Sequence, residues 1–236
     1  MPFNRPVASG FEYPDWPVLL KDNEGAYVNE LMQWGFLPTY ISDGAQASNF
    51  RGGYKDEKGK YHPPVTTLNA IAEEMQDKPM FKKNVGNRCL VLSSGFYEWK
   101  HVPKIGKSGK ELKATDKIPH FIYLKDRPHF FMAGIYNLWT NRATGEVVPT
   151  FAICTTAANT LMQEIHNSKK RMPLILDEEL AKYWLDPTLN EKQITEIAHF
   201  KISESEMDAY EVDKEFRTSP EPNKPRPNED PQNLLL

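Results

Sequence analysis

The stretch at residues 87–100, NRCLVLSSGFYEWK, constrains the fold of this chain more than any other. Its first half contains RCLVL, a short apolar run with Gly-Asn before it and Ser-Ser-Gly after it. Such a run is typical of a buried strand, because the flanking residues favour turns. The second half, GFYEWK, alternates in the manner of a strand, with Phe96 and Glu98 on one face and Tyr97 and Trp99 on the other.

Glu98 is notable because it is a carboxylate inside an aromatic triplet. A carboxylate is costly to bury unless it is hydrogen-bonded or used in chemistry. Two interpretations of this stretch therefore stay open. Glu98 is either a solvated side chain on an alternating strand, or a functional carboxylate held among aromatic rings.

Length and composition bound the class of protein. A chain of 236 residues suffices for one or two domains with a sizeable core. The formal net charge of −3 argues against a generally basic nucleic-acid binder, although it leaves room for a local basic groove. Cys89 and Cys154 lie in apolar runs without a CxxC motif, which indicates reduced core thiols and neither a zinc site nor a disulfide framework. With no signal-peptide pattern and no bilayer-length apolar run, we expect a soluble, cytoplasmic protein.

The pattern along the chain predicts about seven strands and three or four helices. Strands are expected at residues 27–37, 88–92, 120–124, 130–135, 150–155 and 174–176, and helices at 66–75, 159–165, 177–184 and 190–200. Outside them, residues 1–20 are predicted to be extended with no introductory helix or strand, residues 42–64 to form a long exposed loop, and residues 102–117 to form a Lys/Gly-rich hairpin. Together they predict one β-rich α+β domain over residues 1–217, followed by a Pro-rich tail over 218–236.

Two further polar residues are candidates for a site. His166 follows an amphipathic segment and enters a loop that holds Lys169, Lys170 and Arg171. A histidine beside cations suits proton transfer near neutral pH, and the alternative is a helix-terminal histidine that satisfies backbone carbonyls. Asn69, between Leu68 and Ala70, is open between a helix cap and a polar site residue.

These motifs form an ordered set that resembles the SOS response-associated peptidase family, whose members are also called abasic-site processing proteins. The set comprises WG at 34–35, LNA at 68–70, RCLV at 88–91, GFYEW at 95–99, TTAAN at 155–159, and IH followed by RMP within 165–173. The resemblance implies a single β-rich domain with an antiparallel or mixed barrel-like sheet and a few peripheral helices. It also implies a cleft that takes single-stranded DNA bearing an abasic site, in a monomer without cofactor or metal.

In that family the nucleophile is a cysteine directly after the initiator Met. Its α-amine and thiol capture the ring-opened aldehyde of the abasic sugar and close to a thiazolidine. Carried over to this chain, the resemblance implies that Glu98 orients and deprotonates the α-amine. It implies that His166 acts as an acid/base in opening the sugar ring, and that Asn69 holds the crosslink.

The resemblance further implies three DNA contacts. Arg171 and Thr155 would contact phosphate or sugar, and Trp34 would form an apolar wall of the DNA groove. A histidine beside cations and a carboxylate among aromatics are consistent with such a site on an acidic protein.

The chain departs from the family pattern in two places. It begins MPFN where the family opens Met-Cys-Gly-Arg, and it has Ile71 where the family usually has Arg. Whether the chain is an enzyme therefore stays open. Either the gene start lies upstream and supplies the cysteine of a self-crosslinking protein with peptidase-like and lyase-like chemistry, or this is a non-catalytic single-stranded-DNA-binding member. A third hypothesis, a cysteine hydrolase that pairs Cys154 with His166, conflicts with the core-like surroundings of Cys154.

Overall fold

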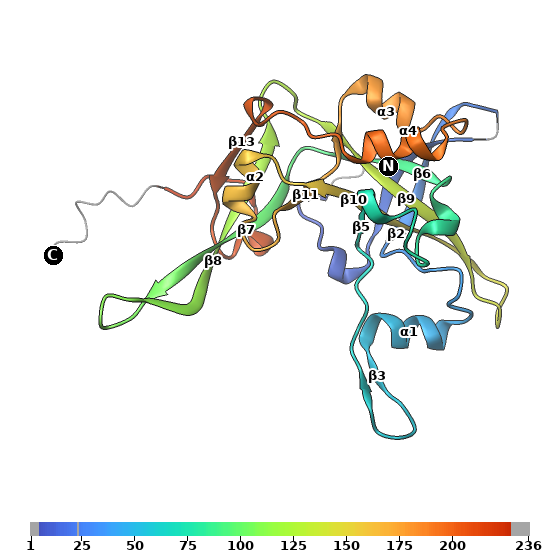
Figure 1. Ribbon diagram of the computed structural model, residues 1–236, viewed down its shortest axis with the longest axis horizontal. Helices are drawn as coiled ribbons and strands as arrows, with labels where there is room; N and C mark the ends of the chain where they lie inside the picture. Colours follow the sequence, from blue (N-terminus) through green and yellow to red (C-terminus); the bar gives the residue numbers. More distant parts are fainter. Residues whose placement is uncertain (1–4, 23, 228–236) are drawn as a thin grey trace.

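The computed structural model describes residues 5–22 and 24–227 (Figure 1). Its strands are β1 (Asp15–Lys21), β2 (Tyr27–Trp34), β3 (Tyr54–Lys55), β4 (Tyr61–His62), β5 (Asn69–Ile71), β6 (Arg88–Ser93), β7 (Phe96–Ile105), β8 (Glu111–Leu124), β9 (Phe130–Thr140), β10 (Val147–Ala157), β11 (Arg171–Pro173), β12 (Ile175–Leu176) and β13 (Met207–Glu211). Its α-helices are α1 (Gly44–Gly52), α2 (Thr160–Ile165), α3 (Glu178–Trp184) and α4 (Glu191–Ala198).

Five of these strands close into a barrel. The hydrogen-bonded order β10-β2-β1-β6-β9 returns to β10 through a pairing of β9 with β10. The pairs are antiparallel except that of β10 with β2, where Thr150 lies opposite Gln33 and Phe151 opposite Trp34. Strands β5, β11 and β12 add to the same sheet. This mixed barrel in a single β-rich domain confirms the predicted fold class.

The barrel strands separate two hydrophobic clusters, because successive side chains of a strand point to opposite faces. Every barrel strand contributes to the interior cluster, for example through Val18, Met32, Val91, Met132 and Phe151. The outer cluster lies beneath α3 and α4, which are neighbours in Figure 1, and it includes Leu90, Ala133, Ala152, Cys154 and Trp184. Adjacent residues of β10 therefore serve different cores.

A second sheet, in the order β13-β8-β7, packs against the barrel. Phe96 of β7 pairs with Ile122 of β8, and both side chains pack in the interior cluster. On the opposite face, Tyr97 and Trp99 pack around Phe216. The alternation predicted for GFYEW is therefore confirmed, and Glu98 lies on the face that looks toward the barrel. The outer halves of β7 and β8 project from the body as the predicted hairpin (Figure 1).

Three of the predicted helices are confirmed as α2, α3 and α4. Each begins after a side chain that accepts a backbone N–H three residues ahead, namely Asn159, Asp177 and Asn190. No helix in the described part of the chain is long and apolar enough to cross a membrane.

Three local predictions are wrong. Residues 66–75 form β5 and a short 3-10 turn rather than a helix, because β5 pairs in parallel with β10. Residues 42–64 contain α1 and the β3–β4 hairpin rather than a bare loop. Arg51 of α1 binds the Gln33 side chain and stacks on Tyr13, which ties this segment to the barrel. Residues 1–20 include most of β1, and residues 1–4 lie outside the described part.

The boundary between the domain and the tail stays a prediction. After residue 217 the described chain still contacts the domain, because Pro225 bridges to Val212 and the Asn223 carbonyl accepts from the Tyr210 hydroxyl. Residues 228–236, which complete the predicted tail, lie outside the described part.

The buried guanidinium of Arg88 yields a test of this packing. It donates to the carbonyls of Trp184 (2.7 Å), Val85 (3.0 Å) and Asp186 (2.5 Å), and so joins β6 to the end of α3. We expect Arg88→Met to lower the free energy of unfolding by about 3 kcal/mol, because three buried acceptors lose their donor. Urea unfolding measures the change, and the exposed Lys82→Met is the control, with an expected change within about 0.5 kcal/mol. Equal changes in the two variants would show that the hydrogen bonds of Arg88 do not stabilise this packing.

Candidate functional site

The fold brings Glu98 and His166 side by side. Glu98 lies on β7 and His166 ends α2, and the distance from Glu98 Oε1 to His166 Nδ1 is 3.6 Å. The two side chains are only 24% and 15% exposed. A carboxylate and an imidazole at this separation and burial are a common arrangement for proton transfer.

The hydrogen bond of His166 defines its reactive nitrogen. Nδ1 lies 2.8 Å from the backbone carbonyl of Arg171, and a carbonyl can only accept, so Nδ1 carries a proton. Glu98 at 3.6 Å lies beyond hydrogen-bonding distance and acts on the ring through charge. The proton that His166 can exchange with a ligand is therefore on Nε2. The interpretation of His166 as a helix-terminal residue that satisfies a backbone carbonyl is confirmed, and its acid/base role stays a prediction.

Asn167 fastens the loop after His166 to strand β7. The backbone N–H of His101 donates to Asn167 Oδ1 (3.1 Å), and Asn167 Nδ2 donates to the His101 carbonyl (2.9 Å). Because β7 is the edge of its sheet, the amide side chain pairs with it as a neighbouring strand would. This clamp holds His166 in register with Glu98. No local sequence pattern indicates this clamp, since 66 residues separate the partners.

Burial raises the pKa of Glu98 above the ordinary glutamate value. Electrostatic interactions with His166 and Lys169 and a backbone hydrogen bond at Trp99 lower the pKa of Glu98, but they do not cancel the effect of burial. A carboxylate with a raised pKa is a stronger base than an ordinary glutamate, which suits it to accept a proton near neutral pH.

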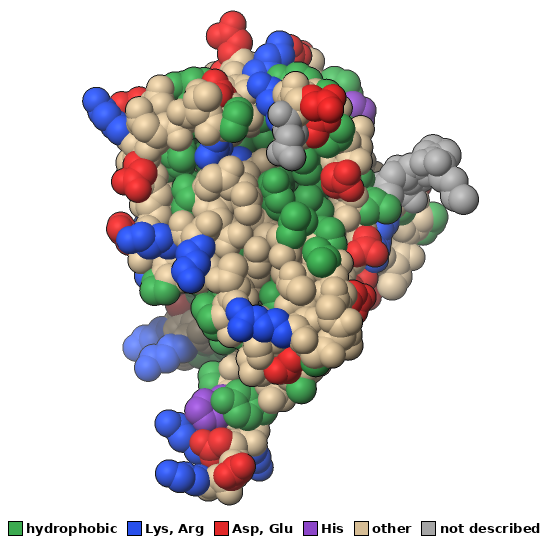
Figure 2. All heavy atoms as spheres, turned by 90° about the vertical axis from the view of Figure 1, so that its right-hand side faces the viewer, with side chains coloured by type: hydrophobic (Ala, Val, Ile, Leu, Met, Phe, Trp, Pro, Cys, Tyr) green, Lys and Arg blue, Asp and Glu red, His purple; other side chains and the backbone are tan. Residues whose placement is uncertain are grey.

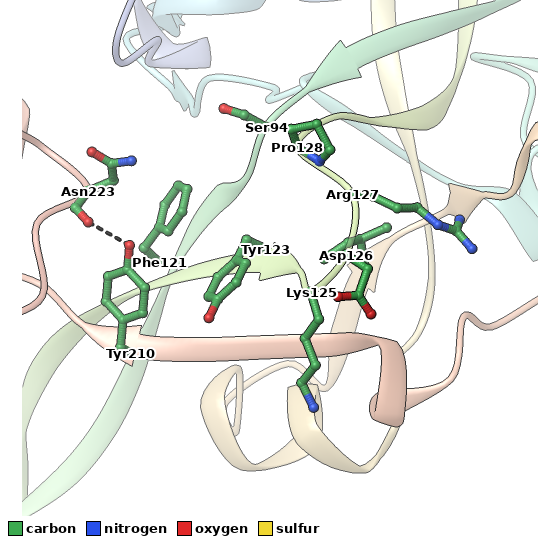
Figure 3. A pocket seen from close by; sticks show the side chains of 10 residues that line it. Ser94, Phe121, Tyr123, Lys125, Asp126, Arg127, Pro128, Tyr210 and Asn223 are labelled. Atoms are coloured by element: carbon green, nitrogen blue, oxygen red, sulfur yellow. Dashed lines mark hydrogen bonds between the residues drawn. The ribbon is translucent and has the colours of Figure 1, made fainter.

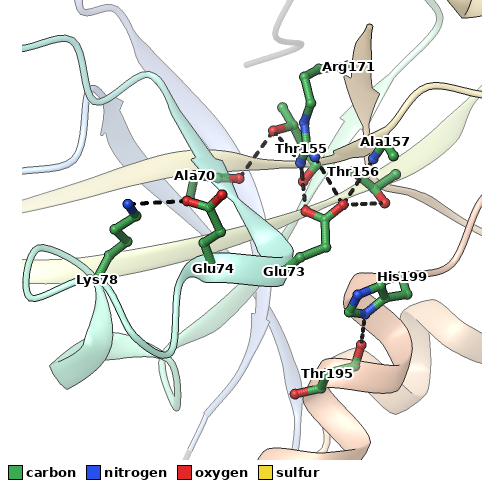
Figure 4. Close-up of polar contacts among 10 residues, drawn as sticks. All are labelled: Ala70, Glu73, Glu74, Lys78, Thr155, Thr156, Ala157, Arg171, Thr195 and His199. Carbon is green, nitrogen blue, oxygen red and sulfur yellow. Dashed lines mark hydrogen bonds and ion pairs between the residues drawn. The ribbon is translucent and has the colours of Figure 1, made fainter.

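Arg171 forms a second charged cluster with Glu73 (Figure 4). Nη1 and Nη2 of Arg171 donate to Oε1 (3.0 Å) and Oε2 (2.7 Å) of Glu73, a bidentate pair. Glu73 also accepts from the Thr156 hydroxyl and the Ala157 N–H, and Nη2 of Arg171 lies 3.3 Å from Thr155 Oγ1. Glu73 was missed in the sequence, because its partner is 98 residues away.

The pKa of Glu73 moves in the direction opposite to that of Glu98. Burial alone raises it, but the hydrogen bonds and charge of Arg171 and the Ala157 N–H outweigh burial and bring the pKa below its usual value. Glu73 therefore stays ionised, and it compensates much of the charge of Arg171. The DNA contact assigned to Arg171 stays a prediction.

Asn69 and Trp34 occupy neighbouring positions at the barrel. Asn69 lies on β5 opposite Ile153, and its exposed side chain makes no hydrogen bond within the described residues. The helix-cap interpretation of Asn69 is thus wrong. Trp34 is half-buried, donates through Nε1 to the Leu68 carbonyl (2.9 Å) and stacks on Phe151. The roles proposed for both residues stay predictions.

Comparison with known proteins gives the family. The sequence profile described as SOS response associated peptidase (SRAP) matches residues 11–219. The chain belongs to this family. It is 33% identical over 215 residues to "Abasic site processing protein YoqW" of Bacillus subtilis (strain 168), covering 90% of this chain and 81% of the relative. It is 26% identical over 175 residues to "Abasic site processing protein HMCES" of Xenopus tropicalis, covering 66% of this chain and 44% of the relative.

A solved structure supports the same conclusion. The chain superposes on a crystal structure of a protein from Bacteroides thetaiotaomicron with a TM-score of 0.75 and 31% sequence identity, covering 93% of this chain and 84% of that one. The family resemblance seen in the motifs is therefore confirmed. The GFYEW motif lies at the start of β7, and the IH…RMP motif runs from the end of α2 to β11. The structure brings Glu98 of the first motif next to His166 of the second.

Neither cysteine of this SRAP protein can serve as a nucleophile for His166. Cys154 is fully buried in the outer cluster, on the face of β10 opposite to Ile153, and burial raises the pKa of its thiol. Cys89 is fully buried as well, and burial raises its pKa too. Within the described residues, no group of three or more His, Cys, Asp or Glu side chains could hold a metal ion.

A surface pocket of about 430 Å³ lies away from the Glu98–His166 pair (Figure 3). Phe121 and Tyr123 of β8 and Tyr210 of β13 line it. Phe121 packs against Tyr97, on the face of the β7–β8–β13 sheet opposite to Glu98. This pocket therefore opens on the opposite face of the sheet from Glu98.

The raised pKa of Glu98 predicts a pH-dependent effect on stability. A folded-state pKa above the unfolded value, about 4.3 for glutamate, favours folding below that value, and the benefit is lost as pH rises through the folded pKa. Glu98→Gln should therefore raise the melting temperature at pH about 7.5 by about 2 °C, and by less at pH about 4. Thermal unfolding at both pH values measures this. The exposed Glu164→Gln should show no such difference, and a Glu98→Gln variant that is less stable at both pH values would contradict the account.

For the Glu73–Arg171 pair we expect the opposite effect, a loss of stability when the glutamate is replaced by glutamine. Glu73→Gln should lower the free energy of unfolding by about 2 kcal/mol at neutral pH, because a mostly buried guanidinium loses its carboxylate. The neighbouring Glu74→Gln is a matched control, since the Glu74 side chain is 50% exposed and, among the described residues, forms an ion pair only with Lys78. Urea unfolding of both variants measures the two changes in the free energy of unfolding. Similar losses would show that the Glu73 pair adds no more than a surface ion pair.

Proposed function

We propose that this protein recognises abasic sites in single-stranded DNA and processes them with Glu98 and His166 as its reactive pair. The observation that carries the proposal is the contact between these two side chains, 3.6 Å apart and both mostly buried, formed by the two most specific SRAP motifs. Relatives that are 31–33% identical over at least 202 residues bear the name abasic site processing protein, which supports this substrate.

The chemistry proposed requires an α-amine and a thiol on one N-terminal cysteine. The amine adds to the aldehyde of the ring-opened sugar, the carbinolamine loses water to give an imine, and the thiol adds across the C=N bond to close a thiazolidine. Water is the only by-product, and the overall reaction is redox-neutral. The amine attacks only when unprotonated, and its ordinary pKa is about 7.7–8.0, so a nearby base matters most at or below neutral pH.

Each site residue has a role in this proposal. Glu98 accepts the proton of the α-ammonium group, a task that its raised pKa favours. His166 exchanges a proton at Nε2 with the sugar as its ring opens, while its Nδ1–H keeps the imidazole oriented on the Arg171 carbonyl. The exposed amide of Asn69 holds the adduct.

The remaining three residues contribute to DNA binding in this proposal. Thr155 and Arg171 contact sugar or phosphate, with Arg171 held in place by Glu73, and Trp34 provides an apolar wall. Such contacts position the strand without reading its sequence, which suits a protein that must find a lesion in any context.

Crosslinking to an abasic oligonucleotide tests the proposal. We compare the printed chain, a version that opens Met-Cys-Gly-Arg, and that version with Glu98→Gln, on denaturing gels over a time course at several pH values. The printed chain, with Pro2 in its second position, should bind single-stranded DNA in a salt-dependent manner without a denaturation-resistant adduct. The cysteine version should crosslink, and Glu98→Gln should slow it by about 100-fold near pH 7 and by less near pH 9.

Glu164→Gln in the cysteine version is the control and should crosslink at the unmodified rate. A Glu98→Gln variant that matches the unmodified protein at every pH would remove Glu98 from the mechanism. DNA binding with no adduct from any version would favour the non-catalytic single-stranded-DNA-binding alternative. An adduct from the printed chain would place the nucleophile elsewhere.

A further inference from the structure

Positive charge is concentrated in one protruding segment. We call residues 100–117 the basic arm; it comprises the outer halves of β7 and β8 and the turn between them. It contains six lysines and two acids, a net charge of +4, whereas the whole chain carries −3. The rest of the chain therefore carries −7, and the arm stands out against an acidic body.

The lysines of the arm are available to a ligand. The arm projects away from the barrel (Figure 1), and five of its lysines are exposed, namely Lys104, Lys107, Lys110, Lys113 and Lys117. Within the described residues, its one ion pair joins Lys104 to Asp116 at 3.2 Å, with both side chains about half exposed. Isolated surface pairs of this kind are weak and yield readily to a competing anion.

The base of the arm is continuous with the Glu98–His166 site. Side chains alternate along β7 as far as an irregularity between Pro103 and Ile105, so Lys100 lies on the same side of the strand as Glu98. At about 3.3 Å per residue, Lys100 follows Glu98 by about 7 Å and Lys104 by about 20 Å. The Asn167 clamp holds His101 at the root of the arm against the loop that carries His166 and Lys169. A path of cations thus leads outward from the site.

The other protruding hairpin, β3–β4, has no such charge. Lys55, Lys58 and Lys60 alternate there with Asp56 and Glu57, and Asp56 also pairs with His62. Figure 2 shows this hairpin at the lower end, with basic and acidic side chains intermixed. The two hairpins therefore provide a matched comparison, with three exposed lysines on each that can be replaced.

We propose that the basic arm binds the phosphates of single-stranded DNA outside the Glu98–His166 site. The inference rests on the proposed function, since it takes the strand to enter at that site and to leave along β7. Lysine is a point charge without base readout, so the contact is independent of sequence. Its effect is to lengthen the stretch of DNA that the protein covers and to hold the lesion-bearing strand while the site acts.

Binding of undamaged, labelled oligonucleotides tests the arm. The arm variant carries Lys107→Ala, Lys110→Ala and Lys113→Ala, and the control variant carries Lys55→Ala, Lys58→Ala and Lys60→Ala, so both lose the same charge. Fluorescence anisotropy is measured with single strands of about 8 and about 24 nucleotides and a duplex of about 24 base pairs, at several salt concentrations.

We expect the arm variant to bind the long single strand about ten-fold more weakly, with the slope of log K against log salt reduced by about 2, as three lost phosphate contacts imply. Its affinity for the short strand should be unchanged, and the control variant should match the parent on both. Equal losses in the two variants, equal losses on short and long strands, or a larger loss on duplex would each overturn the inference.

A parallel crosslinking assay keeps the two proposals apart. In the version that opens Met-Cys-Gly-Arg, the arm variant should crosslink a short abasic oligonucleotide at the parental rate. If no version crosslinks but the arm variant still loses affinity for the long strand alone, the proposed chemistry is wrong and the proposed role of the basic arm is supported. If the parent binds no single-stranded DNA of either length, both proposals fall.

Discussion

The parallel contact between β2 and β10 closes the barrel, and the placement of the site depends on it. It involves only a short register, Thr150 with Gln33 and Phe151 with Trp34. Beyond it, β10 continues to pair with β5 and β11, and then leads into α2 and His166. A slip of one residue would exchange the faces of Ile153 and Cys154, which belong to different cores. The two cores therefore fix the register.

Around this framework, two carboxylates are held in opposite ways. Glu73 is bound by Arg171, Thr156 and Ala157, which favour its charge and tie β11 and the turn after β5 to the end of β10. Glu98 is buried beside His166, where burial outweighs the nearby positive charge and disfavours its ionised form. The first carboxylate stabilises the fold, and the second is held at a cost in stability that is typical of a functional site. The two carboxylates therefore differ in the direction of their pKa shifts because one has a bound guanidinium and the other does not.

Net charge describes this molecule poorly, because its charges are unevenly placed. An acidic body would repel DNA, yet the loop after His166 and the root of the basic arm bring cations to the Glu98 side of β7. The field that a DNA strand meets depends on such local arrangement, since screening limits the reach of distant charges to about 10 Å. An acidic protein can therefore present a basic path to a polyanion.

Local patterns in the sequence were sufficient for the features that depend on neighbours along the chain. Asn159, Asp177 and Asn190 cap their helices through bonds to residues three positions on, and the alternation of GFYEW placed Glu98 on one face of a strand. The order of the motifs also indicated the SRAP family.

Contacts between distant segments were decided only by the tertiary structure. Residues 69–71 have a helix-like pattern but form a strand, because an open edge of β10 is available to them. Glu73 meets Arg171 across 98 residues, and Asn167 meets His101 across 66. A hydrogen bond within one helical turn depends on residues close in sequence, so a local pattern can predict it. These pairings form only after the barrel has closed and brought distant segments together.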